Sequence, residues 1–282
     1  MLITPSTTAD TTARLIEMWV EGLSPHTEAS YRYSAAQFFS YINKPLALVE
    51  LTDLQLWLRS LSSLTASSKK TRLVAVKSLL SFAHKIGVLE KNPGVGMRHP
   101  KVRDTLNERI LSVEEVQAIL NKESSLRNRL ILRLLYSGGL RVSELCALKW
   151  KDFLPRGDSG QVTVFGKGGK TRTVLLSEAL WAELMKMKCD SPPTAPVFAH
   201  IKDPAAHLDR TYIFRIVRAA GERAGIQKVS PHWLRHAHAS HSLDRGAPLH
   251  LVQHTLGHAS VTTTSRYLHA RPNDSSALYL PD

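Results

Sequence analysis

Apolar residues in the stretch 8–90 recur every three or four positions, which is the spacing of amphipathic helices, and no strand-like alternation interrupts them. Ser24 and Pro25 favour a helix start, because serine caps the first turn and proline fits its first position. Gly87 favours a helix end. The pattern therefore predicts helices over residues 11–21, 25–42, 52–60 and 67–87.

The stretch 91–108 breaks this pattern. It begins KNPGVG, carries four basic residues after Lys91 and has little apolar content. Such a composition is typical of an exposed loop or an interdomain linker. Because the stretch separates two differently patterned blocks, a basic hinge is favoured over a plain solvated loop.

Beyond Arg109 the pattern becomes mixed. Ser112 and Glu115 form a capping box ahead of a helix. Two β-branched runs flank Gly-Lys-Gly-Gly in 161-QVTVFGKGGKTRTVLL-176, which predicts a β-hairpin. Helices are predicted over residues 113–121, 126–137, 177–188, 210–224, 231–244, 248–256 and 260–268.

These elements predict a mainly α protein with a small β-sheet. A helical domain is expected over residues 1–98, a basic linker over 99–108 and an α+β domain over 109–282. With 282 residues, 43% of them hydrophobic, the chain has enough apolar material for two cores. It carries only two cysteines, outside any C-x-x-C pair, and neither a signal peptide nor a membrane-length apolar run, so we expect a cytoplasmic protein.

The chain is strongly basic, with a formal net charge of +13 and a pI of about 9.9. Such an excess of lysine and arginine indicates a polyanionic partner, nucleic acid first and an acidic membrane surface second. Charge bears on association and says nothing about the fold. The choice between these partners therefore depends on the residues that could carry chemistry.

Arg141 and Glu144, in 136-YSGGLRVSELCALKW-150, are three residues apart and thus neighbours on a helical face. One interpretation is a surface ion pair, which contributes little to stability. The other is an anion site, because Arg141 follows a Gly-Gly-Leu turn and so lies near a helix start, where backbone N–H groups also favour an anion. These residues alone leave both interpretations open.

Gly166 to Lys170 form the turn of the predicted hairpin and place lysine side chains at its tip. A phosphate-binding loop is excluded, since the G-x-x-x-x-G-K-[ST] pattern and the strand-to-helix context are both missing. A solvated basic turn is the simplest interpretation. Lys167 is nevertheless well placed to enter a DNA groove or to donate a proton.

The stretch 230-SPHWLRHAHASHSLDRG-246 places His232, Arg235 and His236 on one face of a helix that starts with a Ser230 cap and Pro231. The histidines could bind a metal, or His232 and Arg235 could face a phosphate. A metal site is disfavoured, because H-E-x-x-H and paired Cys/His ligands are missing and Arg235 would repel a cation. A first-turn imidazole tends to stay neutral and can accept a proton, while an arginine grips phosphate oxygens.

Near the end of the sequence, in 255-TLGHASVTTTSRYLHA-270, His258 follows a glycine break. Ser260 is expected to cap a short helix that carries Tyr267 in its final turn. A lone tyrosine is most often a packing residue. Together with the residues above, however, Tyr267 and His258 complete a set of an oxygen nucleophile, two phosphate clamps, a base, a hydrogen-bond donor and a cationic acid.

These motifs resemble those of the tyrosine recombinase family, which includes phage integrases and Xer-like recombinases. The N-terminal block is similar to that family's helical core-binding, SAM-like domain, with L-S-P-H-T-E-A-S-Y at 23–31 and K-N-P at 91–93. In the second block the motifs stand in order as G-G-L-R-V-S-E-L (138–145), G-K-G-G-K (166–170), H-W-L-R-H (232–236), L-G-H (256–258) and T-T-S-R-Y (263–267).

The resemblance implies a covalent mechanism. Arg141 and Arg235 would hold the non-bridging oxygens of a DNA phosphate, and Tyr267 would attack the phosphorus. The products would be a 3′-phosphotyrosyl intermediate and a free 5′-hydroxyl, without a metal or nucleotide cofactor. The protein–DNA ester would conserve the energy of the phosphodiester for rejoining.

The resemblance also implies supporting roles. Lys167 would protonate the leaving 5′-oxygen, and His232 would assist proton transfer at the tyrosine. His258 would hydrogen-bond the phosphate, and Glu144 would orient an arginine or the histidine. His236 is interpreted as a structural residue of its helix.

The resemblance implies that the partner is double-stranded DNA with specific recombination sites, bound by a homotetramer, or a paired heterotetramer, on two duplexes. Two alternatives use the same fold: a catalytically silent DNA-binding protein, and a topoisomerase IB-like enzyme that relaxes DNA. A metal-dependent nuclease ranks behind both. The residues expected at the DNA backbone are Lys69, Lys70, Arg72, Lys101, Arg103, Lys170 and Arg172.

Overall fold

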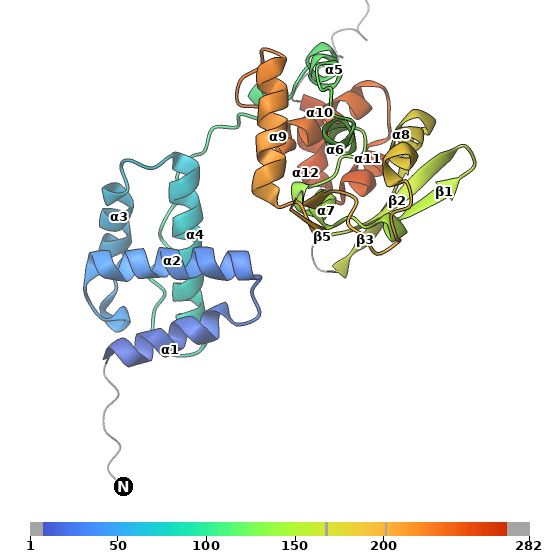
Figure 1. The fold of residues 1–282 in the computed structure, drawn as a ribbon. Coiled ribbons are helices and arrows are strands. Elements are labelled where there is room, and N and C mark those ends of the chain that lie inside the picture. The colour runs from blue at the N-terminus through green and yellow to red at the C-terminus, as the bar shows by residue number, and fades with distance from the viewer. Residues whose placement is uncertain (1–7, 167–168, 201, 270–282) are drawn as a thin grey trace, which may run out of the picture. The chain divides into compact units, whose positions relative to one another are not determined.

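The computed structural model describes residues 8–166, 169–200 and 202–269 (Figure 1). The chain divides into two compact units between Arg103 and Asp104. This boundary falls inside the segment 99–108 expected to be a linker, and the residues from Asp104 onward belong to the second unit. Each unit has its own cluster of buried apolar side chains.

The first unit is helical, as its spacing of apolar residues predicted. The side chains of Phe38 and Trp57 are almost fully buried and meet edge to face, with ring centroids 5.1 Å apart. Leucines from the longest helix complete this core. The helices are α1 (Thr8–Val20), α2 (Pro25–Ile42), α3 (Leu51–Ser60) and α4 (Ala66–Lys85), with a 3-10 turn at Leu46–Leu48.

Local capping explains where these helices begin. The Ser24 hydroxyl accepts a hydrogen bond from the backbone N–H of Thr27 at 3.4 Å, so the predicted Ser-Pro start is confirmed. Helix α3 begins at Leu51, just ahead of the predicted start, because Glu50 is its N-cap. The Asp53 carboxylate accepts from the backbone N–H of Glu50 at 2.7 Å and closes this turn.

The second unit combines helices with two small antiparallel sheets, so the predicted mainly α fold with a small β component is confirmed. Its helices are α5 (Val113–Asn121), α6 (Leu126–Tyr136), α7 (Val142–Ala147), α8 (Glu178–Lys188), α9 (Arg210–Arg223), α10 (Pro231–Asp244), α11 (Leu249–Leu256) and α12 (Val261–Ser265). The 3-10 turns are Asn107–Arg109, Trp150–Asp152 and Arg266–His269. The strands are β1 (Phe153–Arg156), β2 (Ser159–Phe165), β3 (Thr171–Leu176), β4 (Ala199–His200) and β5 (Asp203–His207).

The predicted hairpin is confirmed as β2 and β3, which pair with Val162 opposite Val174. Side chains of β3 alternate between exposed and buried from Thr171 to Leu176, as expected for a sheet with one covered face. The sequence pattern missed β1, which pairs with β2 at the edge of this sheet. Pro155 explains why β1 was not predicted, because proline is rare in strands and is found mainly in edge strands such as this one.

Helix α10 is central to the second unit and packs against α5, α6, α9 and α11 (Figure 1). A small apolar cluster beside it joins Leu106 and Ile110, from the start of the unit, to Leu256 and Tyr267 near its end. Segments far apart in the sequence thus meet around α10. Among the described helices, none has the length and apolar character that crossing a membrane requires.

Candidate active site

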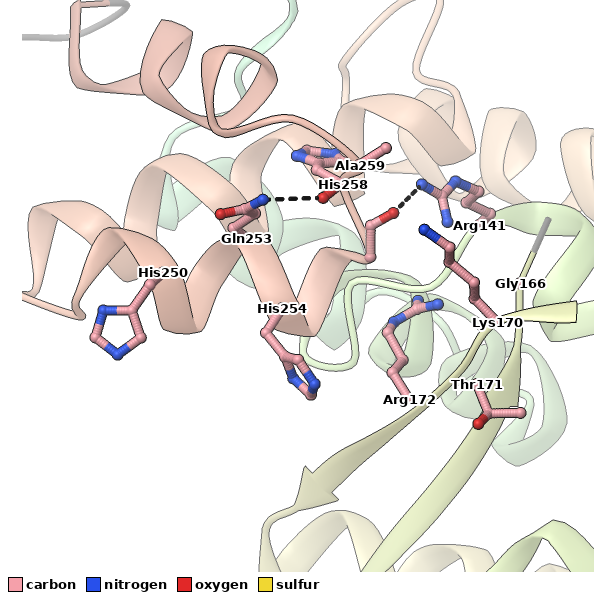
Figure 2. A pocket seen from close by; sticks show the side chains of 11 residues that line it. Arg141, Gly166, Lys170, Thr171, Arg172, His250, Gln253, His254, His258 and Ala259 are labelled. Atoms are coloured by element: carbon pink, nitrogen blue, oxygen red, sulfur yellow. Dashed lines mark hydrogen bonds between the residues drawn. The ribbon is translucent and has the colours of Figure 1, made fainter. Parts of the chain in front are cut away.

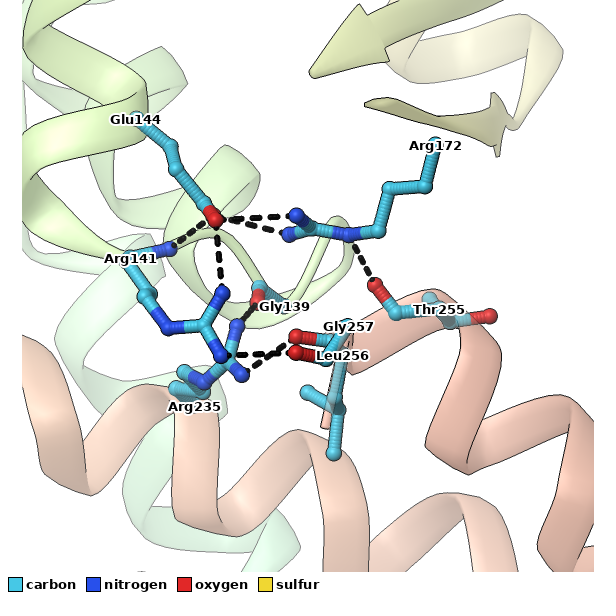
Figure 3. A network of polar contacts seen from close by, with 8 residues as sticks. All are labelled: Gly139, Arg141, Glu144, Arg172, Arg235, Thr255, Leu256 and Gly257. Atoms are coloured by element: carbon cyan, nitrogen blue, oxygen red, sulfur yellow. Dashed lines mark hydrogen bonds and ion pairs between the residues drawn. The ribbon is translucent and has the colours of Figure 1, made fainter. Parts of the chain in front are cut away.

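The C-terminal end of α11 is the place where three arginines from distant elements converge (Figure 3). Carbonyls in the last turn of a helix lack partners within the helix and carry the negative end of its dipole, so they attract cations. Three successive carbonyls here each accept from a different guanidinium. Arg172 Nε donates to Thr255 O at 2.6 Å, Arg235 Nη2 to Leu256 O at 2.5 Å and Arg141 Nη2 to Gly257 O at 2.9 Å.

Glu144 connects two of these arginines. Its side chain is buried and accepts from Arg141 Nη1 at 2.7 Å and from Arg172 Nη1 and Nη2 at 2.9 and 2.8 Å. It also accepts from the backbone N–H of Arg141 at 2.8 Å, which closes a capping box at the start of α7. Burial alone would raise the pKa of Glu144, but the hydrogen bonds and charges of Arg172 and Arg141 lower it, so the carboxylate is ionised.

Replacing Glu144 with glutamine is expected to destabilise the second unit. The change leaves the buried guanidinium of Arg172 without its counter-charge, which typically costs about 3–5 kcal/mol. Because the pKa of Glu144 is lowered by folding, its stabilisation is present above the ordinary carboxyl pKa and is lost as pH falls through the lowered value. Thermal unfolding of parent and variant should therefore differ strongly at neutral pH and converge in acid.

Glu183→Gln is the matched control. Glu183 pairs with Arg133 in the same unit at 2.7 Å, but both side chains keep exposed surface. A pair of this kind contributes up to about 1 kcal/mol. Equal melting temperatures for the Glu144→Gln variant and this control would contradict the structural importance of the buried carboxylate.

Arg172 requires a correction. It was expected at the DNA backbone, but its side chain is only 6% exposed and its guanidinium is bound to Glu144 and to the carbonyl of Thr255. The alternation of β3 places Arg172 on the same covered face as Val174 and Leu176. This period of two was visible in the sequence and could have identified Arg172 as an internal residue.

Arg235 is buried as well and bridges two segments. Its Nη1 donates to the carbonyl of Gly139, in addition to the bond with Leu256. Burial, followed by the charge of Arg141, lowers the pKa of Arg235 to about 9, so the guanidinium remains a cation at neutral pH. A guanidinium carries five N–H donors, so these bonds do not exhaust its capacity to bind a further anion.

Gly139 must be glycine for this arrangement. Its φ is +58°, in the left-handed region. A Cβ at this position would come within 2.9 Å of the Leu256 side chain and 3.0 Å of the His238 ring. The Gly-Gly break noted in the sequence thus lets its carbonyl reach Arg235.

An open cleft of about 620 Å³ is lined by two of these arginines, Arg141 and Arg172 (Figure 2). It runs between the hairpin strands and α11, and no acidic residue is found among the described side chains that line it. A cleft with cationic and neutral walls attracts anions. Its basic and polar lining includes Arg141, Lys170, Arg172, His250, Gln253, His254 and His258.

The hairpin turn borders this cleft through Gly166 and Lys170. The backbone N–H of Gly166 donates to the carbonyl of Lys170 at 2.7 Å, which closes the turn. Lys170 is exposed and keeps its predicted availability to an external anion. Lys167, the predicted proton donor, lies outside the described residues.

His232 lies in the first turn of α10, as predicted, and is exposed. Ser230 is the N-cap residue, but its side chain makes no capping hydrogen bond, contrary to expectation. Desolvation, followed by the charges of Arg235 and Arg141, lowers the pKa of His232, so the ring is neutral at neutral pH. Within the described ranges, no group of three or more His, Cys, Asp or Glu side chains could hold a metal ion.

His258 follows Gly257, which caps α11 in the left-handed conformation. Its Nδ1 is 2.9 Å from the hydroxyl of Thr264, which is fully buried. Burial, followed by the charges of Arg235 and Arg141, lowers the pKa of His258 to about 4. When Thr264 donates to Nδ1, the neutral ring carries its proton on Nε2 and can donate from there.

Tyr267 is not in the predicted helix, since α12 ends at Ser265 and the tyrosine lies in the following 3-10 turn. It is only 5% exposed and packs with Leu106, Ile110 and Leu256. Its hydroxyl is 2.6 Å from Nδ1 of His236. Burial raises the pKa of Tyr267, against the charges of Arg235 and Arg266, so the hydroxyl is protonated at neutral pH.

The interpretation of His236 as a purely structural residue missed this contact. His236 is the described hydrogen-bond partner of the Tyr267 hydroxyl, although 31 residues separate them. The sequence placed His236 one turn after His232 on the same helical face, which was the available signal. Nothing in the sequence indicated that a distant tyrosine would meet it there.

The remaining basic candidates belong to the first unit. Lys70, Lys101 and Arg103 are exposed, and Lys69 is partly exposed. Arg72 lies over the ring of Tyr33, with its guanidinium carbon 5.1 Å from the ring centroid. The contact of these five residues with DNA stays a prediction.

Two family models match the chain. The model described as "Phage integrase family" matches residues 109–274, and "Phage integrase, N-terminal SAM-like domain" matches residues 16–87. Similar sequences include a "Tyrosine recombinase XerC" from Pelobacter propionicus, 35% identical over 88% of this chain and 85% of the relative. A "Tyrosine recombinase XerA" from Pyrococcus furiosus is likewise 35% identical, over 88% of this chain and 85% of the relative.

Solved structures share the fold. XerH site-specific recombinase bound to its difH substrate matches with a TM-score of 0.72 and 23% identity, over 99% of this chain and 86% of that one. A lambda integrase tetramer bound to a Holliday junction matches with a TM-score of 0.76 and 20% identity, over 96% and 79%. At these identities the likeness concerns the fold alone.

The sequence relatives and the family models cover both units. The second-unit model alone spans more than half of the chain, and it contains every motif residue from Arg141 to Tyr267. The chain therefore belongs to the phage integrase family and is a tyrosine-type site-specific recombinase.

Proposed function

We propose that this recombinase breaks and rejoins DNA at specific sites through a covalent intermediate on Tyr267, with Arg141 and Arg235 binding the scissile phosphate. The observation that carries the proposal is the convergence of these two guanidiniums at the end of α11, where Arg141 also lines a cleft that has no acidic residue among its described side chains. Charged N–H donors in this arrangement favour a phosphate.

The chemistry is a transesterification. The hydroxyl oxygen of Tyr267 forms a bond to phosphorus while the bond from phosphorus to the 5′-oxygen breaks. The 3′-phosphate remains on the tyrosine, and Lys167 supplies the proton for the 5′-oxygen. Rejoining reverses these steps with a 5′-hydroxyl of either strand, so no nucleotide cofactor is consumed.

Stabilisation of the transition state comes from fixed cations and donors. Negative charge grows on the phosphate oxygens during attack, and pre-oriented charges stabilise it without further rearrangement. Glu144 supports this role, because it fixes Arg141 through both its backbone N–H and its guanidinium. His258 offers a donor from Nε2, and His232 assists proton transfer from its exposed position.

DNA binding is proposed to involve both units, the residues 1–98 and 109–282, joined by the basic linker 99–108. Contacts with the phosphate backbone make such binding strongly dependent on salt. A tetramer on two duplexes, of one or two kinds of subunit, fits this function, and the lambda integrase comparison provides one related assembly. Proposed backbone contacts are Lys69, Lys70, Arg72, Lys101, Arg103 and Lys170.

A nicked suicide substrate tests the proposal directly. Cleavage next to the nick releases a short fragment whose loss prevents rejoining, so the covalent protein–DNA complex accumulates. Mass spectrometry of the digested complex should place the DNA on the peptide that contains Tyr267. Cleavage without a covalent complex, or an adduct on another residue, would refute the assignment.

The role of Lys167 predicts a specific rescue. The variant Lys167→Ala should cleave an ordinary substrate about 10²–10⁴-fold more slowly, as is typical for loss of a general acid. A substrate with sulfur in place of the bridging 5′-oxygen should be cleaved at nearly the parental rate, because a thiolate leaves without protonation. Single-turnover cleavage of both substrates measures the effect.

Lys170→Ala is the matched control, because Lys170 belongs to the same hairpin turn but is proposed to bind the DNA backbone. Its effect should appear as weaker binding at moderate salt and should be the same for the oxygen and sulfur substrates. If sulfur fails to restore cleavage by the Lys167 variant, the proton comes from another group.

A further inference from the structure

The hydroxyl of Tyr267 has a defined partner inside the protein. It lies 2.6 Å from His236 Nδ1, and the two rings are tilted by 44° with centroids 5.7 Å apart. The tyrosine ring is held by Leu106, Ile110, Val252 and other apolar residues, so the ring itself is fixed by packing. The hydrogen bond then fixes the direction of the hydroxyl.

At neutral pH both groups of this hydrogen bond are uncharged. Burial, followed by the charges of His232, Arg235, Arg109 and Arg266, lowers the pKa of His236 to about 4. The imidazole is thus neutral at neutral pH and offers one ring nitrogen as an acceptor. In the neutral tautomer that carries its proton on Nε2, Nδ1 of His236 is the acceptor and the protonated phenol of Tyr267 donates to it.

We propose that His236 orients the hydroxyl of Tyr267 and accepts its proton when the oxygen attacks the DNA phosphate. This inference rests on the proposed function. In the step, the O–H bond of Tyr267 breaks and its proton moves to Nδ1, which makes His236 an imidazolium. The oxygen–phosphorus bond forms as the bond to the 5′-oxygen breaks, and the proton returns during rejoining.

The surrounding charges link this proton transfer to the presence of DNA. The cations that disfavour an imidazolium at His236 include Arg235, which is also a proposed phosphate ligand. A bound phosphodiester brings negative charge next to these cations and offsets their effect. His236 therefore becomes a better proton acceptor when the phosphate is in place.

His232 has a different position. Its ring centroid is 6.5 Å from that of His236 and its surface is exposed, whereas His236 contacts the nucleophile. The geometry thus assigns the first proton transfer to His236. His232 is left to exchange protons with solvent or with DNA.

Single-turnover cleavage of a nicked suicide substrate by excess protein tests this assignment. His236→Leu, which removes the acceptor, should cleave about 10²-fold more slowly or worse, the typical effect of losing a general base. His236→Asn should be intermediate, because an amide oxygen can accept the tyrosine hydrogen bond but not its proton. The His236→Leu variant should cleave the sulfur-bridged substrate slowly as well, since its defect concerns the nucleophile and not the leaving group.

Two controls separate a chemical effect from a structural one. His238→Asn makes the same exchange two residues further along α10, where the ring bonds the carbonyl of Tyr136 at 2.7 Å, and should cleave normally. Added imidazole should restore part of the activity of His236→Gly, which no merely structural defect would allow. DNA binding and melting temperature are measured for each variant.

The possible outcomes distinguish failure of the proposed role of His236 from failure of the proposed function. If the parent protein forms no covalent complex, the proposed function itself fails. If the parent does so and His236→Leu cleaves at an equal or higher rate, only the role of His236 is overturned, and the contact instead restrains the tyrosine. If His236→Leu does not fold, the Asn variant and the imidazole rescue decide, and normal cleavage by His236→Asn would refute proton acceptance.

Discussion

The variant Tyr267→Phe is expected to bind DNA as tightly as the parent and to form no covalent complex with it. Removal of the hydroxyl eliminates the nucleophile, and losses of a nucleophile are typically on the order of 10⁴-fold or more in rate. The ring keeps its packing against Leu106 and Ile110, so folding should persist. The hydrogen bond to His236 is lost, at a cost of about 1 kcal/mol in stability.

Gel electrophoresis under denaturing conditions detects the covalent complex, and a mobility shift detects binding. Tyr136→Phe is the matched control, since it also removes a partly buried hydroxyl bonded to a histidine, His241, at 2.9 Å. That variant should still form the complex. A covalent complex with Tyr267→Phe would show that another residue attacks the phosphorus.

The second large effect is expected at Arg235. Replacing it with alanine removes a proposed phosphate ligand, and loss of one such donor lowers rates by about 10²–10³-fold. It also leaves the carbonyls of Gly139 and Leu256 without their partner, at about 1–3 kcal/mol for each buried group. We therefore expect slower cleavage together with a lower melting temperature.

Two further variants separate these contributions. Arg235→Lys keeps the positive charge, but an ammonium lacks the planar fork that reaches two carbonyls and a phosphate, so cleavage should remain slow. Arg245→Ala removes an exposed arginine from the end of the same helix and should change neither property. Parental cleavage by Arg235→Ala would exclude Arg235 from phosphate binding.

Local signals in the sequence were sufficient for most elements of the fold. The helical spacing of apolar residues and the Ser-Pro and Ser–Glu caps located helices such as α2 and α5, because these features act within one or two turns. The glycine-rich turn located the hairpin of β2 and β3. Strands β1, β4 and β5 escaped prediction, since they are short, contain proline or pair irregularly.

The sequence was less informative about which basic residues are available to a partner. Arg141, Arg172 and Arg235 are chemically alike, and charge alone did not distinguish an internal cation from an external one. In the structure Arg172 is hydrogen-bonded to Glu144 and to the carbonyl of Thr255, whereas Lys170 is exposed at the cleft. Arg172 lies on the covered face of β3, whereas Lys170 precedes the strand and lies in the exposed turn.

By itself, the sequence determined the helical first unit, the hairpin, the family and the identity of the chemical groups, because periodicity, caps and motif spacing are local properties of the chain. Only the tertiary structure decided that the carbonyls of residues 255–257 accept hydrogen bonds from arginines of three distant elements. It also decided that His236 lies within hydrogen-bond distance of the hydroxyl of Tyr267. These contacts join residues 21 to 116 positions apart. Such contacts depend on how the helices pack around α10, which no local pattern encodes.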